Sequence, residues 1–201
     1  MANYNVVETT NMWGAKCLSF QATSDIENGM LVAKGDLVTG ETDIYTASVP
    51  TTSDEVYLVA NPAWSYDNNR ATDQNEENYI NKAGVPFRVY QLKKDNKFKT
   101  YSTGITPITE TKESETKKDV PVAVGQYITV DGSTNKPKAV ATKPTSGFVG
   151  KVIAVEEIGF PYCIGSIGQN VVIGSGDSAV GMGYSADTRV TKVTIEVIKN
   201  V

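Results

Sequence analysis

A glycine-rich segment offers the first candidate for chemistry. Residues 174–179 (GSGDSA) follow the apolar run Val171–Ile173 and match the G-x-G-x-x-A pattern that binds dinucleotide phosphates. That pattern requires a helix whose N-terminus receives the pyrophosphate. Gly181 and Gly183 interrupt the turns in which such a helix would form. We therefore interpret the segment as a glycine-rich loop between strands.

Residues 67–77 suggest a second chemistry, because their side chains carry the oxygen ligands that calcium prefers. An EF-hand loop that began at Asp67 would have Thr72 in place of the central glycine and Asn78 in place of the final glutamate. We interpret the stretch as a solvated loop, and an irregular calcium site is the alternative. The ligands of that alternative would be Asp67, Asn69, Asp73, Asn75 and Glu77.

The absence of histidine is more informative than either motif. It removes Ser-His-Asp and Cys-His catalysis, the commonest zinc ligand and the usual proton carrier near neutral pH. Paired carboxylates can hydrolyse glycosides without histidine. Glu156 and Glu157, however, are adjacent and would point to opposite faces of a strand. We expect a protein that is not an enzyme, with no catalytic residue, no bound metal and no cofactor.

Three aromatic side chains in polar surroundings are candidates for protein interaction. Trp64 and Tyr66 lie between Pro62 and the acidic loop, and Trp13 lies in the polar stretch of residues 1–14. Exposed aromatics are typical of contact surfaces for a protein or a sugar. Half-buried core aromatics are the alternative. The candidate contact residues are Trp13, Trp64 and Tyr66.

The charge balance limits the partners. Nineteen Lys and Arg against 23 Asp and Glu give a net charge of −4 and a pI of about 5.0. This argues against nucleic-acid binding and against attraction to anionic membranes. No apolar run approaches the roughly 20 residues that span a bilayer, and no signal peptide is visible. We expect synthesis in a cytosol, with Cys17 and Cys163 as buried thiols; a bridge between them is the alternative.

Almost every periodic segment predicts a strand. Val193, Ile195 and Val197 alternate with polar residues, which indicates a strand with one buried face. Residues 56–59 and 152–155 are apolar on both faces, as in strands covered twice.

Turn residues divide these strands. Asp95-Asn96 between residues 87–92 and 98–101 predicts a hairpin, and Asp131-Gly132 predicts a second turn. Only residues 73–82 offer a helical turn or two.

The predicted fold is all-β, with two small barrel-like or sandwich-like units. Residues 26–60 and 122–154 show a similar order of apolar runs, so an internal repeat is one interpretation. The predicted parts are an extended N-terminal arm (1–15), a first β unit (16–108) with a long polar loop (65–82), a charged linker (109–119) and a second β unit (120–201).

The repeated stretches resemble a known class of protein. Residues 26–32 (IENGMLV), 43–47 (DIYTA) and 55–62 (EVYLVANP) are similar to tailed-bacteriophage head proteins that decorate or cement the capsid shell. Residues 125–130 and 148–156 resemble the small β-barrel of several such proteins. The resemblance carries no catalytic residue.

The resemblance implies a non-enzymatic virion protein on the outside of a bacteriophage capsid, made in the host cytoplasm. Its partners would be the major capsid protein and copies of itself, as a homo-oligomer, with no nucleic acid and no membrane. Residues 1–14 would then clamp an edge strand of the capsid, and their deletion would leave the fold intact. A frayed terminus is the alternative interpretation of these residues. A phage tail or head-fibre component, or a carbohydrate-binding adhesion module, is the alternative.

Overall fold

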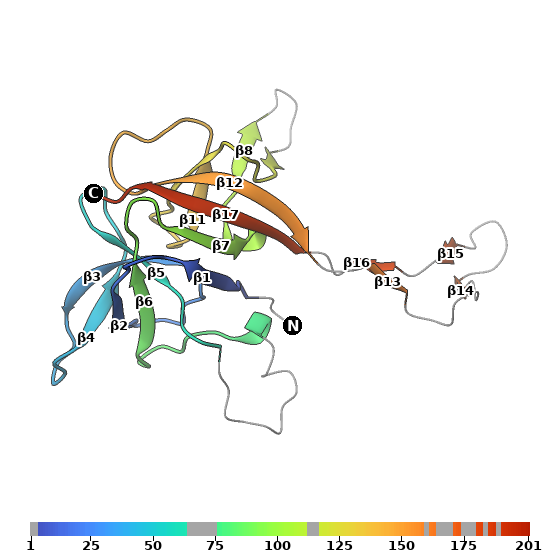
Figure 1. The fold of residues 1–201 in the computed structure, drawn as a ribbon. Coiled ribbons are helices and arrows are strands. Elements are labelled where there is room, and N and C mark those ends of the chain that lie inside the picture. The colour runs from blue at the N-terminus through green and yellow to red at the C-terminus, as the bar shows by residue number, and fades with distance from the viewer. Residues whose placement is uncertain are drawn as a thin grey trace, which may run out of the picture.

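The computed structural model describes residues 4–63, 76–111, 117–158, 161–163, 171–173, 180–182, 185–187 and 190–201. In these residues every regular element is a strand, apart from two short 3-10 helices (Figure 1). The all-β prediction is therefore confirmed. Of the helical turns predicted in residues 73–82, the described part contains η2 (Glu76–Asn78); the second short helix is η3 (Ser102–Gly104).

The first half of the chain forms a closed five-stranded barrel in the order β2-β4-β3-β5-β6. Neighbouring strands are antiparallel except β2 and β4, which are parallel. Its interior is filled by Phe20, Val32, Tyr57 and other buried apolar side chains. The strands are β2 (Cys17–Gln21), β3 (Leu31–Leu37), β4 (Ile44–Ser48), β5 (Val56–Val59) and β6 (Phe87–Gln91).

The second half contributes most of a six-stranded sheet in the order β1-β7-β17-β12-β10-β11. Val193, Ile195 and Val197 are all fully buried in it, as their alternation predicts. The predicted turn at Asp131-Gly132 joins β10 to β11. The strands are β1 (Val7–Asn11), β7 (Lys97–Tyr101), β10 (Tyr127–Val130), β11 (Pro137–Val140), β12 (Val149–Ile158) and β17 (Val190–Lys199).

Three two-stranded ladders complete the described fold. β13 (Pro161–Cys163) pairs with β16 (Ser185–Asp187), and β14 (Val171–Ile173) pairs with β15 (Val180–Met182); in Figure 1 both lie beyond the ends of β12 and β17.

The third ladder corrects a prediction. β8 (Ile108–Thr111) and β9 (Lys117–Val120) are antiparallel, so residues 109–119 are not simply a linker. In its register residue 110 stands opposite residue 118.

The hairpin predicted around Asp95-Asn96 is wrong. Asp95 does adopt the left-handed turn conformation (φ 69°), but β6 belongs to the barrel and β7 to the six-stranded sheet. Phe87 of β6 packs inside the barrel, whereas Phe98 of β7 packs in the other core. The strand pairing thus divides the chain before β7, which lies inside the predicted first unit of residues 16–108.

The N-terminal arm is part of the fold. β1 pairs with β7 of its own chain, and Glu8 forms an ion pair with Lys192 of β17. Asn5 is 3% exposed, and Met12 is buried in the main core. The free arm predicted for residues 1–15 is therefore wrong over this segment, because the arm's backbone and side chains are engaged within the chain.

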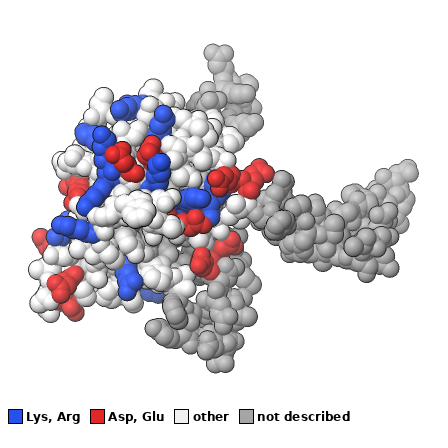
Figure 2. All heavy atoms as spheres, in the orientation of Figure 1, with Lys and Arg blue, Asp and Glu red and all other residues white. Residues whose placement is uncertain are grey.

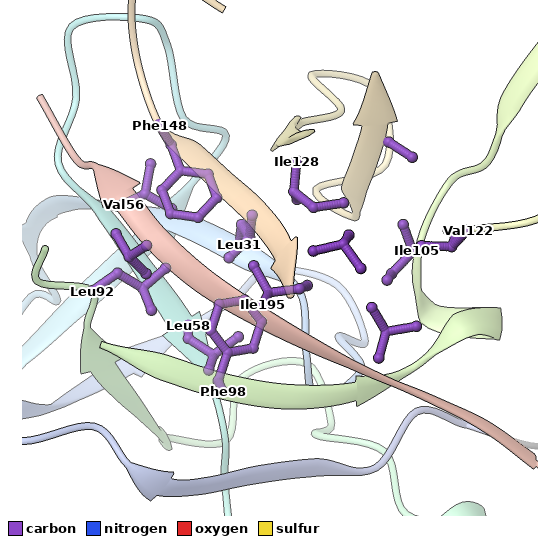
Figure 3. Packing of buried hydrophobic residues seen from close by; sticks show 14 of the residues in the cluster. Leu31, Val56, Leu58, Leu92, Phe98, Ile105, Val122, Ile128, Phe148 and Ile195 are labelled. Carbon is purple, nitrogen blue, oxygen red and sulfur yellow. The ribbon is translucent and has the colours of Figure 1, made fainter. Parts of the chain in front are cut away.

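A hydrophobic core shared by the barrel and the sheet lies between them, and it is separate from the core inside the barrel. All four residues of β5 are buried, and they alternate in direction: Tyr57 and Val59 face the barrel interior, whereas Val56 and Leu58 face the sheet. Figure 3 shows Val56 and Leu58 in one cluster with Phe98, Phe148 and Ile195. The predicted double-faced burial of residues 56–59 thus arises because this strand belongs to two cores at once.

The barrel and the sheet have the same strand scheme. β3 is antiparallel to β4 and β5, and β10 is antiparallel to β11 and β12. In each half a glycine with positive φ, Gly29 or Gly125, donates its N–H to a valine carbonyl, Val59 or Val152. That valine's N–H donates to the residue after the glycine in both halves. Descent from an internal repeat stays a prediction, now with matching local geometry.

The similarity extends to the closing contact. In the barrel, β4-β3-β5-β6-β2 is closed by the parallel pair β2–β4; in the sheet, the order is β11-β10-β12-β17-β7. Thr106, which follows β7 and η3, forms a parallel bridge with Lys138 of β11. The six-stranded sheet therefore curls toward closure at the corresponding place.

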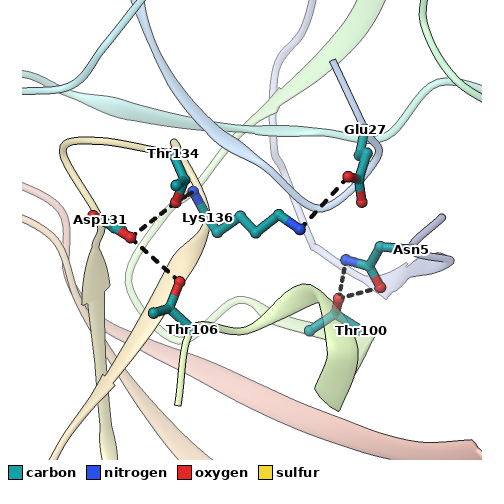
Figure 4. Close-up of polar contacts among 7 residues, drawn as sticks. All are labelled: Asn5, Glu27, Thr100, Thr106, Asp131, Thr134 and Lys136. Atoms are coloured by element: carbon teal, nitrogen blue, oxygen red, sulfur yellow. Dashed lines mark hydrogen bonds and ion pairs between the residues drawn. The ribbon is translucent and has the colours of Figure 1, made fainter. Parts of the chain in front are cut away.

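Polar contacts hold the β10–β11 turn against the barrel (Figure 4). The N–H of Leu31 donates to the carbonyl of Asn135 at 2.7 Å, and Lys136 lies 3.5 Å from Glu27. The Asp131 carboxylate shapes this turn, because it accepts hydrogen bonds from the N–H and the hydroxyl of Ser133. The hydroxyl of Thr134 donates to the same carboxylate at 2.9 Å.

These hydrogen bonds, from Ser133 first and then from Thr134, lower the pKa of Asp131. A carboxyl group with a lowered folded-state pKa stabilises the fold above its unfolded pKa, and this contribution disappears as the pH falls. We expect Asp131→Asn to lower the free energy of unfolding at pH 7 by about 1 kcal/mol, given the site's exposure to water. Urea unfolding at several pH values should show this gap closing below about pH 4. An unchanged gap at low pH would contradict the assignment.

Candidate interaction surface

Acidic side chains are sparse in the clusters and cavities of the described residues. These residues contain no group of three His, Cys, Asp or Glu side chains placed to hold a metal ion. Four surface cavities in this part of the chain are each lined by one acidic side chain at most. One cavity of about 190 Å³ lies between β1 and residues 60–63, and Glu76 is the single acidic residue that lines it. None of these cavities offers the two carboxylates of a glycosidase.

Several sequence candidates lie outside the described residues: Trp64, Tyr66, residues 67–75 of the acidic loop and the glycine-rich residues 174–179. Of the acidic stretch, Glu76 and Glu77 are described, and both belong to η2.

The cysteine prediction is wrong for one residue. Cys17 is exposed and free, because it begins β2 at the barrel's rim, whereas buried thiols were expected. Cys163 lies in β13.

Trp13 is the sequence candidate that the structure places clearly. Trp13 is 81% exposed, which is the largest exposure among the large apolar residues described. The preceding Met12 is 9% exposed and packs in the main core, and the following Gly14 adopts the left-handed conformation (φ 64°). The chain therefore turns sharply here, which buries one side chain and projects the next into solvent.

The turn that carries Trp13 is anchored to the body. The Asn96 side chain, which is 4% exposed, donates its Nδ2 to the carbonyl of Trp13 at 3.1 Å. Its Oδ1 accepts a hydrogen bond from the N–H of Lys93 at 2.9 Å. One buried amide thus fixes both the tryptophan backbone and the neighbouring residues 93–96. An aromatic held on an ordered backbone loses little conformational entropy when a partner covers it.

One lysine side chain lies beside this turn. A Cβ placed on Gly14 would lie 3.9 Å from the Nζ of Lys93, so the ammonium group is close to the Trp13 turn. Lys94 follows and is also exposed. An exposed aromatic with a cation beside its turn is suited to contact a protein surface, because aromatic residues contribute much of the binding energy at interfaces.

Comparison with known proteins identifies no relative. No protein-family model, no curated protein and no solved structure matches the chain. In addition, none of the helical turns among the described residues is long or apolar enough to cross a membrane.

Proposed function

We propose that this chain is a non-enzymatic structural protein of a bacteriophage virion that binds the outside of the capsid and stabilises the mature shell. The observation that carries the proposal is the 81% exposure of Trp13 on an anchored turn of an all-β body. Its partners are the major capsid protein and further copies of itself. The resemblance of residues 26–62 and 125–156 to capsid decoration proteins supports the same class.

The mechanism follows from mass action. A protein that binds the expanded shell and not its precursor stabilises the expanded lattice by an amount that grows with its concentration. Many equivalent sites on the shell make a modest affinity at each site sufficient. The rigid core shared by the barrel and the sheet suits this role, because a rigid body can hold neighbouring capsid subunits at a fixed distance.

The contact is expected at Trp13 rather than through a free arm. We expect Trp13→Ala to weaken binding to mature shells of the virus that carries the gene by about tenfold or more, because aromatic anchors contribute about 2 kcal/mol. Cosedimentation with purified shells measures this directly. Folding should be unchanged, because the side chain is exposed.

Val85→Ala is the matched control, since Val85 is 53% exposed and lies before β6, in a different loop. It should bind shells as tightly as the unmodified protein. Equal binding by all three proteins would remove Trp13 from the contact. Binding of the unmodified protein to glycans, without binding to shells, would overturn the proposed function itself.

A further inference from the structure

A cluster of lysines from three separate segments lies at the end of the body that carries the C-terminus. Two surface grooves meet there, with volumes of about 340 and 500 Å³, and both are lined by Ile198 and Lys199. In Figure 2 basic side chains gather on the part of the body where Figure 1 places this end. We call it the basic end; its lysines are Lys93, Lys94, Lys143 and Lys199.

The basic end is rigidly built. The Asn200 side chain accepts a hydrogen bond from the N–H of Val56 at 2.9 Å and donates to the carbonyls of Val56, at 2.9 Å, and Leu92, at 2.6 Å. Further along β17, Val197 exchanges backbone hydrogen bonds with Asp95 and Asn96, each at 2.9 Å. These bonds fix the end of β17 between the barrel and the turn of residues 93–96, so the lysines project from an ordered base.

Among the described residues, the lysines of the basic end have no ion-pair partner, like Lys34 and Lys138 but unlike five other lysines. Lys82, Lys97, Lys99, Lys136 and Lys192 form ion pairs. Within the described part of the chain, none of the four at the basic end does so.

Two acids lie nearby, and their two negative charges offset only part of the charge of the four lysines. Glu55 accepts hydrogen bonds from the Tyr57 hydroxyl at 2.7 Å and from Gln91 at 2.5 Å. Asp95 is exposed on the turn. The local charge is therefore positive on a chain whose net charge is −4.

We infer that the basic end docks an acidic protein surface, with carboxylates opposite the lysines and an apolar side chain opposite Ile198. Resting on the proposed function, the inference places this acidic surface on the outer face of the capsid. Charge complementarity of this kind speeds association and selects the partner, and salt weakens it. Because Lys93 lies beside the Trp13 turn, one docked surface can cover both.

The test is a charge-reversal pair, Lys94→Glu/Lys199→Glu, compared with Lys34→Glu/Lys138→Glu. The control lysines are exposed on β3 and β11, outside both grooves, and change the net charge equally. Circular dichroism and thermal unfolding establish that both variants fold. Affinity for mature shells is then measured by cosedimentation between about 50 and 500 mM salt.

We expect the basic-end variant to bind shells at least tenfold more weakly at low salt and to lose most of the salt dependence. The control should stay within about twofold of the unmodified protein. If the unmodified protein binds shells and the basic-end variant binds equally well, this inference is wrong and the proposed function stands. If the unmodified protein binds no shell, the proposed function is wrong, and the inference that rests on it is wrong as well. Binding of duplex DNA that only the basic-end variant loses would assign the lysines to nucleic acid and overturn the inference.

Discussion

Asn5→Ala is expected to lower the free energy of unfolding by about 3 kcal/mol, because it leaves two polar groups, the Thr100 hydroxyl and the Tyr101 N–H, without their hydrogen-bond partner. The Asn5 Nδ2 donates to the hydroxyl of Thr100 at 2.5 Å, and that hydroxyl donates to the Asn5 Oδ1 at 2.8 Å. The N–H of Tyr101 also donates to this oxygen, at 3.0 Å. Thr100 is fully buried, so water cannot replace the lost amide. Urea unfolding measures the difference.

The surroundings of Asn5 make the loss larger than that of an ordinary amide. A Cβ on either Gly29 of the barrel or Gly104 of η3 would collide with the Asn5 side chain, so two glycines leave the space that it fills. Asn11→Ala, at the exposed end of β1, the strand that follows Asn5, is the control and should cost less than about 0.5 kcal/mol. Similar small losses for both variants would show that the arm contributes little to stability.

A double-mutant cycle with Thr100→Val isolates the hydrogen-bonded pair. Thr100→Val removes the other half of the contact, so Asn5→Ala should cost less in its presence than alone. The cycle also bears on the arm as a whole. Because β1, Asn5 and Met12 are integrated, deleting residues 1–14 should destabilise the fold, contrary to the sequence-based expectation.

Sequence patterns predicted individual strands better than their partners. The alternation of Val193, Ile195 and Val197 identified the buried face of β17, because a strand's side-chain period is a local property. Asp95 also adopts a turn conformation, which is a local property, although the hairpin predicted around it is wrong. Which sheets the strands on either side of that turn join depends on contacts with residues far away in the chain, and no local signal contains them.

For strands that are apolar on both faces, burial of the second face was harder to predict. Residues 152–155 are as apolar as residues 56–59, yet only Val152 is fully buried, and the rest of that run is half-buried. β5 lies between two cores, whereas the outer face of the sheet carries ion pairs such as that of Lys99 in β7 with Glu156 in β12. The prediction of burial on both faces, made from the same apolar composition, is therefore right for β5 and wrong for β12.

The candidate surface was only partly accessible to sequence reasoning. Trp13 stood out because a large aromatic in a polar stretch has few local reasons to be there. The basic end has no such signal, because Lys93, Lys143 and Lys199 come from distant segments. They meet only through the pairing of Val149 with Lys199 and the hydrogen bonds of Asn200 to the barrel.

Gly150→Val is expected to lower the free energy of unfolding by about 3 kcal/mol by overfilling the sheet's core. Gly150 is buried in β12, opposite Ile128 of β10 and Val197 of β17. Even a Cβ at this position would lie 2.8 Å from Ile195 Cγ2 and 3.3 Å from Ile128 Cβ. Branched side chains in strands have restricted rotamers, so neither isoleucine can move aside easily. Gly132→Val, where nothing lies within 4 Å, is the control and should be nearly neutral.

A second substitution that removes side-chain atoms of Ile195 tests whether overfilling causes the loss at Gly150. Ile195→Ala alone should cost about 3 kcal/mol, because it opens a cavity in the shared core. It removes as many carbon atoms as valine adds at residue 150, so the double variant should recover at least about 2 kcal/mol relative to the sum of the single losses. Chemical unfolding of the four proteins gives this coupling energy. Additive losses would mean that Gly150 is required for its backbone and not for the space that Ile195 occupies.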